Sequence, residues 1–192
     1  MIEQKDSLRS CPRWRFPPSA ARPNRVSGAA RSEWLGLLLF SLPTGSLYAA
    51  TYEHRVIGAV IAAEASNQGR AGMVAVAEVI HQRVAESGWT TFQVVTHGNR
   101  REGKYAFSCL NRTTPTALVK KWQRDPAYDT ALELAQLLCE APEKLPDTTR
   151  SANFFKRSGA KPEWARGRNP VVVIKDHAFY RIPANSGYKR AW

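Results

Sequence analysis

The chain has 192 residues, enough for one domain and extra sequence at one end. Its residues are 43% hydrophobic and 10% aromatic, which argues against a wholly disordered protein because a core of real size can be buried. The formal net charge of +12 favours a polyanionic partner, or simply gives a solvated basic surface. No zinc finger, glycine-rich phosphate loop or RNA-binding aromatic motif accompanies this charge, so we expect no nucleic-acid partner.

Residues 1–50 are predicted to be a basic leader that ends in a secretory signal peptide. Arginines precede a short apolar run over residues 35–42, after which Pro43 and Gly45 break the run and two alanines follow. This order is typical of exported precursors, and the apolar run is short for a membrane span. We therefore expect an exported mature domain over residues 51–192, acting in the periplasm or cell wall. An uncleaved membrane anchor or a disordered arm is the alternative.

The first predicted element after the leader is a helix over residues 52–64. Val56, Val60 and Glu64 recur at intervals of four residues, so they lie along one face of this helix. Gly69 follows and supplies a stop. Glu64 is therefore predicted to lie at the C-terminal end of an amphipathic helix, on its apolar face.

Three further helices and one long loop are predicted in the next part of the chain. A helix over about residues 70–86 carries apolar residues at helical spacing and ends at Gly88. Residues 89–115 are predicted to form a long loop, and loops of this length are often functional. A short helix near residues 116–123 and a clearer one over 126–139 complete the helical part.

The last third of the chain changes from helical to strand patterning. Residues 152–155, 171–174 and 177–182 form runs typical of β-strands. Helices that precede a small antiparallel sheet indicate the α+β class and a single domain.

Glu64 is the residue whose position suggests chemistry. A carboxylate at the end of a partly buried helix loses hydration, and the negative end of the helix dipole lies nearby; both effects favour its protonated form. A protonated carboxyl near neutral pH is what general-acid cleavage of a glycosidic bond requires. From periodicity alone, however, a helix-end glutamate that simply reaches water explains the position better.

The stretch from Ala62 to Val84 contains Glu64 and matches a known sequence pattern. The matching residues are Glu64-Ala65, Gly72, Val74–Ala77, Val79-Ile80 and Arg83-Val84. The stretch resembles the opening of the SleB/CwlJ family of cell-wall hydrolases, which includes the spore cortex-lytic enzymes. That family's pattern runs roughly G-E-A-R-G-E, a short spacer, and then G-Q-V-A-V-A-x-V-I-x-N-R-V.

Three later segments match the same family in the same order. Phe107–Cys109 is similar to its F-S-C segment. Ala152–Phe155 followed by Pro162–Ala165 resembles its aromatic strand and P-x-W-A stretch, and Ile174–Tyr180 resembles its closing I-G-N-H-x-F-Y. The resemblance covers about residues 55–182, and four motifs in the right order make it specific.

The resemblance implies a fold akin to that of lysozyme and lytic transglycosylases, with a helical lobe and a small antiparallel β lobe around a glycan cleft. It also implies that Glu64 is the catalytic acid and base. Two departures from the pattern matter, because Ser66 and Gln68 stand where the family has Arg and Glu. Since the family is thought to work with one essential glutamate, we interpret these departures as tuning of activity.

We expect from this a lytic transglycosylase-like enzyme that cleaves peptidoglycan between N-acetylmuramic acid and N-acetylglucosamine, with no stable protein partner. The substrate's own acetamido group or 6-hydroxyl would stabilise or capture the oxocarbenium-like centre. The alternative is a muramidase that uses water and a second carboxylate, roughly 5–9.5 Å from the first. Asp147 and Asp176 are outside candidates for that second group. A catalytically silent wall-binding module is the rival from another class.

Eight further residues are candidates for contact with the substrate. Aromatic side chains can stack on sugar faces, although aromatics at strand positions are more often part of a core. A hydroxyl at Ser108 could orient Glu64 or cap a loop, and His177 fits a structural role at least as well as a catalytic one. The candidates are Tyr105, Phe107, Ser108, Asn153, Phe155, Trp164, His177 and Tyr180.

No metal and no cofactor are expected. The four histidines and the two cysteines that follow the leader show no zinc-ligand spacing. In an oxidising compartment Cys109 and Cys139 could form a disulfide, whereas two unrelated buried thiols are an equally consistent interpretation.

Overall fold

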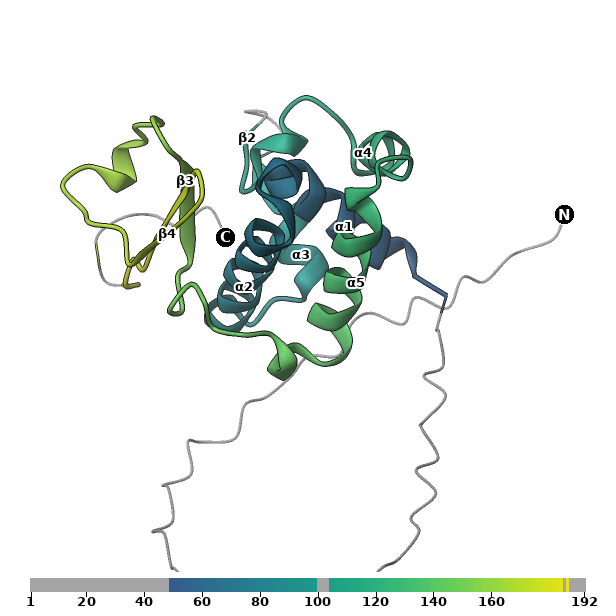
Figure 1. Ribbon diagram of the computed structural model, residues 1–192, viewed down its shortest axis with the longest axis horizontal. Coiled ribbons are helices and arrows are strands. Elements are labelled where there is room, and N and C mark those ends of the chain that lie inside the picture. Colours follow the sequence, from purple (N-terminus) through teal and green to yellow (C-terminus); the bar gives the residue numbers. More distant parts are fainter. Residues whose placement is uncertain (1–48, 100–103, 185, 187–192) are drawn as a thin grey trace, which may run out of the picture. The chain divides into compact units, whose positions relative to one another are not determined.

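The computed structural model describes residues 49–99, 104–184 and 186, so nearly all of the predicted leader lies outside the described residues. Figure 1 shows a group of helices with a small sheet beside it. The helices are α1 (Tyr52–Ala65), α2 (Gly69–Ser87), α3 (Thr91–Thr96), α4 (Pro115–Trp122) and α5 (Ala127–Glu140). Single 3-10 turns are η1 (Ser66–Gln68), η2 (Ser108–Leu110), η3 (Pro142–Lys144) and η4 (Glu163–Ala165).

The strands of the described residues form two antiparallel sheets. They are β1 (Gly98–Asn99), β2 (Lys104–Tyr105), β3 (Phe154–Arg157), β4 (Val172–Ile174) and β5 (His177–Tyr180). The first sheet is the β1-β2 hairpin, and the second has the order β3-β5-β4. In the second sheet His177 of the central strand faces Arg157 on one side and Ile174 on the other. The sheet therefore places the start of β5 between its two neighbours.

The α+β class predicted from the sequence is confirmed, because a helical lobe precedes a small antiparallel sheet. This arrangement is consistent with the lysozyme-like fold that the resemblance implies. None of the helices in the described ranges has the length and apolar content of a membrane span.

Helix α1 lies at the centre of the helical lobe. Its apolar side chains from Val56 to Ala62 are fully buried, and α2, α3, α4 and α5 all pack against it. Gly58 permits the close approach of α5, because a Cβ at this position would lie 3.2 Å from the Cα of Leu132 in α5. A helix that is apolar on several faces is stable only when it is covered in this way. The packing therefore fixes the end of α1, where Glu64 lies.

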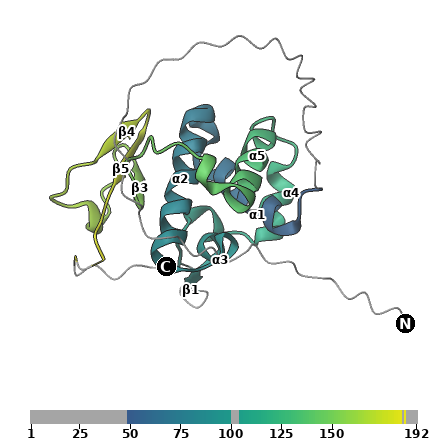
Figure 2. The same ribbon diagram turned by 90° about the horizontal axis from the view of Figure 1, so that it is seen from below.

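The three-stranded sheet packs on α2. Ala75 and Val79 of α2 form an apolar cluster with Ala152 and Phe179, and all four are fully buried. Figures 1 and 2 both show the sheet on one side of α2 and α5 on the other. Helix α2 is therefore the common wall of the helical lobe and the β lobe.

The prediction of one long loop over residues 89–115 is wrong. The structure places α3, the β1-β2 hairpin and η2 in this segment. Helix α3 has six residues and begins with a capping box, in which Thr90 and Gln93 each bind the other's backbone N–H. Its buried face consists of little more than Val94 and Val95. So short a helix shows no repeated periodicity, which is why the pattern of apolar residues does not reveal it.

The structure contains no Cys109–Cys139 disulfide. Cys139 lies in the last turn of α5, where it is part of the core of the helical lobe. Cys109 lies in η2 beside Glu64 at the end of α1. The alternative of two separate thiols is the one that the fold supports.

A buried carboxylate ties the segment between α5 and β3 to α2. Glu78 of α2 is 5% exposed, and its two oxygens accept hydrogen bonds from the hydroxyl of Thr148 (2.8 Å) and the backbone N–H of Thr149 (2.7 Å). Buried donors need such partners because water cannot reach them. This contact therefore sets where the chain enters the β lobe.

We predict that Glu78→Ala lowers the free energy of unfolding by about 2 kcal/mol, because it leaves the buried N–H of Thr149 without an acceptor. Urea-induced unfolding followed by circular dichroism measures the change. Glu140→Ala, an exposed position at the end of α5, is the matched control and should change stability by less than about 0.5 kcal/mol. Equal stability of the two variants would contradict the assigned role of Glu78.

Candidate active site

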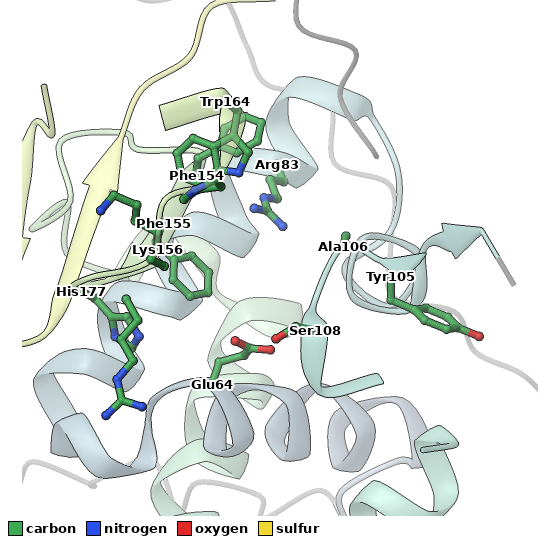
Figure 3. A pocket seen from close by; sticks show the side chains of 13 residues that line it. Glu64, Arg83, Tyr105, Ala106, Ser108, Phe154, Phe155, Lys156, Trp164 and His177 are labelled. Carbon is green, nitrogen blue, oxygen red and sulfur yellow. The ribbon is translucent and has the colours of Figure 1, made fainter. Parts of the chain in front are cut away.

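A cavity of about 580 Å³ opens between the helical lobe and the β lobe. Its wall is formed by the end of α1, one residue of α2, the β2–η2 segment, β3 with the residues after it, and the start of β5 (Figure 3). Elements that are distant in the sequence therefore meet around one opening, as is usual for a ligand site.

Glu64 lies on the helical side of this cavity and is half-buried. One of its carboxylate oxygens accepts a hydrogen bond from the backbone N–H of Cys109 at 3.2 Å. In Figure 3 the carboxylate and the hydroxyl of Ser108 face each other. The hydrogen bond from η2 thus orients the carboxylate, which still lines the open cavity.

The thiol of Cys109 also faces Glu64. Burial raises the pKa of this thiol well above its usual range, and the negative charge of Glu64 and a hydrogen bond to Glu64 raise it further. Cys109 is therefore a protonated thiol at neutral pH, not a nucleophile. Its contribution to the site is to donate hydrogen bonds toward the carboxylate.

The opposite wall carries His177, whose side chain is 5% exposed. Burial lowers the pKa of His177 below its ordinary value of 6.5, the positive charge of Arg157 lowers it further, and Asp176 acts in the opposite direction. The ring meets Phe155 edge-on at 5.5 Å between centroids. Its Nδ1 has no hydrogen-bond partner among the described residues. The imidazole is therefore neutral at neutral pH.

Arg83 of α2 is a buried cation on the cavity wall that the sequence analysis matched to a motif without giving it a role. Its Nε donates a hydrogen bond to the backbone carbonyl of Asn153 at 2.8 Å, and its guanidinium lies over the rings of Phe107 (4.9 Å) and Phe154 (5.6 Å). Such stacking stabilises a cation where water is scarce. Arg83 therefore joins α2 to the first residues of the β lobe.

Two further cations that the sequence analysis missed, Lys156 and Arg157, line the same cavity. They directly follow the predicted strand over residues 152–155, so the only signal was that this aromatic run continues into basic residues. Together with Arg83 they give the cavity a positive balance, since Glu64 is the single carboxylate among its described lining residues. A cavity of this kind attracts anionic ligands.

Six of the nine predicted site residues lie on the cavity wall. They are Glu64, Tyr105, Ser108, Phe155, Trp164 and His177. In Figure 3 the ring of Tyr105 points away from Glu64, whereas Ser108 points toward it. Contact of these side chains with a substrate remains a prediction.

The other three predicted residues are buried beside the cavity and do not line it. Phe107 belongs to the core of the helical lobe and is 1% exposed. Asn153 is fully buried and exchanges hydrogen bonds with the backbone of Ile182 at 2.8 and 2.9 Å. Tyr180 packs edge-on against Trp164 and lines a neighbouring cavity of about 340 Å³. These residues support the wall from behind.

Neither outside candidate for a second carboxylate lines this cavity. Asp147 accepts a hydrogen bond from the backbone N–H of Ser151 at 2.6 Å, which is a turn contact. Asp176 is hydrogen-bonded to the side chain of Gln68. Within the described ranges, no group of histidine, cysteine, aspartate or glutamate residues could hold a metal ion.

Comparison with known proteins gives one family. Residues 67–180, more than half of the chain, match the sequence model of the family Hydrolase_2, which is described as Cell Wall Hydrolase. The match begins just after Glu64 and includes both strands that form the opposite wall of the cavity. Searches of curated proteins and of solved structures give no significant match.

We predict that Glu64→Gln speeds the alkylation of Cys109. Removal of the neighbouring negative charge lowers the pKa of the thiol, which increases the thiolate fraction that reacts. Peptide mass spectrometry after treatment with iodoacetamide at pH 8 measures the rate at each cysteine. Cys139 in α5 is the internal control and should react equally in both proteins. An unchanged rate at Cys109 would show that the charge of Glu64 does not act on it.

We predict that His177 makes the folded state sensitive to acid. Because the pKa of His177 is lower in the folded chain than in the unfolded chain, the unfolded chain binds the proton more readily below about pH 6.5. The free energy of unfolding should therefore be independent of this group above that pH and should fall as the pH is lowered through it. Urea titrations at pH 7 and pH 5 should give a smaller difference for His177→Phe than for the native chain. Equal differences would contradict the prediction.

Proposed function

The chain belongs to the cell wall hydrolase family, and we propose that it cleaves the glycan strands of peptidoglycan with Glu64 as the single general acid and base. The observation that carries this proposal is the half-buried carboxylate of Glu64, held by the N–H of Cys109 at the edge of an open cavity. No second carboxylate lies on the wall of that cavity in the described part of the chain. Glu64 therefore has to perform both proton transfers.

The proposed reaction begins with Glu64 in its protonated form. It donates the proton to the glycosidic oxygen between N-acetylmuramic acid and N-acetylglucosamine, the bond from C1 to that oxygen breaks, and an oxocarbenium-like centre forms at C1. The oxygen of the substrate's own 6-hydroxyl then bonds to C1, and the carboxylate of Glu64 takes up the hydroxyl proton. The product end is a 1,6-anhydro sugar, and Glu64 is ready for another cycle.

The charge of the cavity supports an anionic glycan as the substrate. The cavity is lined by three cationic side chains, Arg83, Lys156 and Arg157. Glu64 is the one acidic residue among its described lining residues. Peptidoglycan carries carboxylates on its peptide stems, so the cations draw the strand toward the cavity. The neutral ring of His177 and the aromatic faces of Phe155 and Trp164 offer the less polar surface on which a sugar ring can stack.

Export of the catalytic domain is part of the same proposal. A wall-cleaving enzyme has to reach the wall, and the basic and apolar leader of residues 1–50 has the order of a secretion signal. The mature domain over residues 51–192 then acts in the periplasm or the cell wall. It needs no metal and no cofactor for the reaction written above.

We predict that Glu64→Gln lowers the release of soluble glycan from purified sacculi at least about 100-fold, because the amide can neither donate nor accept the required proton. Glu140→Gln, the same change at an exposed position in the last turn of α5, is the matched control and should keep the native rate. Release by Glu64→Gln at the native rate would overturn the assignment of the acid.

The mass of the released fragments separates the proposed reaction from its alternatives. Anhydro-muramyl ends indicate the transglycosylase, and reducing ends, heavier by one water, indicate a muramidase that uses water. A native chain that binds sacculi without releasing any glycan is a wall-binding module, and that result would overturn the proposed activity.

A further inference from the structure

Gln68 and Asp176 form a reciprocal pair of hydrogen bonds outside the cavity wall. The backbone N–H of Asp176 donates to the side-chain oxygen of Gln68 at 3.0 Å, and the amide nitrogen of Gln68 donates to a carboxylate oxygen of Asp176 at 3.3 Å. Gln68 belongs to η1, which directly follows α1, and Asp176 lies in the turn between β4 and β5. The pair therefore joins the helical lobe to the β lobe.

The side chain of Gln68 is held in place by its surroundings. It is 1% exposed, which is unusual for a glutamine. Gly72, one turn into α2, is the residue that makes room for it, because a Cβ at Gly72 would collide with the Cβ of Gln68. A buried amide in a space of this kind has few other conformations, so its two hydrogen bonds define where Asp176 lies.

The pair connects both walls of the cavity. On the helical side, Gln68 is the fourth residue after Glu64 and follows it through the end of α1. On the other side, Asp176 directly precedes His177, and its carbonyl accepts a hydrogen bond from the backbone N–H of Ser158 at 2.6 Å. Ser158 in turn follows Arg157, which lines the cavity. One contact thus fixes β3 and β5 relative to the end of α1.

We propose that the Gln68–Asp176 pair, called here the interlobe clasp, is a positioning device for the cleavage reaction, and that it requires one amide and one carboxylate in either order. An amide at either position can donate to a carboxylate at the other, whereas two carboxylates would repel each other across this contact. Neither residue touches the substrate; both act by holding the opposite wall at the right distance from Glu64. This inference rests on the proposed function.

In the clasp of this chain the amide lies at position 68 and the carboxylate at position 176. Gln68 stands where the pattern that the chain resembles has Glu, and Asp176 stands where the closing I-G-N-H of that pattern has Asn. In this chain the amide of Gln68 and the carboxylate of Asp176 are in contact. Gln68 is therefore not a lost catalytic carboxylate but one half of a pair whose charge lies on the other partner.

The test is an exchange of the two groups. Gln68→Glu places two carboxylates face to face, and we expect glycan release from sacculi to fall roughly 10- to 100-fold, the scale of a misplaced catalytic group. Gln68→Glu combined with Asp176→Asn restores one amide and one carboxylate, and release should return to within about threefold of the native rate on the same scale. Lowering the pH adds a proton to one of the facing carboxylates in Gln68→Glu. The ratio of its glycan-release rate to that of the native chain should therefore rise as the pH is lowered.

Gln123→Glu is the matched control. Gln123 is exposed at the end of α4 and lies outside the described lining of the cavity. The same change of amide to carboxylate is therefore made away from the clasp and the cavity, and the rate should stay at the native value. All rates are compared at a temperature at which circular dichroism shows each variant to be folded, so a loss of stability alone does not lower them.

Two results would overturn the clasp as a positioning device. One is a Gln68→Glu variant that is folded and as fast as the native chain, and the other is a double variant that is folded and as slow as Gln68→Glu. If the native chain itself releases no glycan, the proposed function fails, and hydrogen exchange at the amide of Asp176 then decides on the clasp. Gln68→Ala should speed that exchange because it removes the acceptor, and an unchanged exchange rate would overturn the clasp independently of any activity.

Discussion

The site depends on the burial of α1 on all sides. Four other helices cover the apolar residues between Val56 and Ala62, so the helix cannot shift without opening the core. Glu64 lies in the same helix two residues after this buried stretch, so its backbone is held in place by the same packing. The N–H of Cys109 then fixes one carboxylate oxygen, and the rest of the side chain faces the cavity. In the proposed reaction Glu64 transfers a proton twice, which requires its carboxyl group to stay in one place, and the core supplies that constraint.

The opposite wall is held by different forces, because the β lobe is too small to have a large core of its own. Its sheet relies on α2, through the apolar cluster around Phe179 and through Arg83, which stacks on Phe154 and binds the carbonyl of Asn153. Polar contacts at the edges complete the attachment: Glu78 binds the entering chain, and Gln68 binds the turn before β5. The position of the opposite wall therefore depends on one apolar cluster, on Arg83 and on a few specific hydrogen bonds.

The large elements could be predicted from local pattern. The helices around Val60, Val76 and Ala135 and the strands around Phe155 and Phe179 lie where periodicity and residue type place them. Short elements could not be predicted in this way, since α3 and the β1-β2 hairpin contain too few residues to repeat a period. Motif matching found Glu64, Ser108 and His177, which lie on the cavity wall. It equally selected Phe107 and Asn153, because a motif does not distinguish a residue in the wall from one that supports the wall.

The sequence by itself determined the α+β class, the order of the large elements, the family and the position of Glu64 at the end of a helix. Each of these depends on neighbours within a few residues or on the order of motifs. Only the tertiary structure decided which residues share the cavity with Glu64. It brought Lys156 and Arg157 to the wall, separated Cys109 from Cys139, and paired Gln68 with Asp176 across 108 positions of the chain. Contacts over such a separation depend on how α2 holds the sheet against the helices, and no local pattern carries that information.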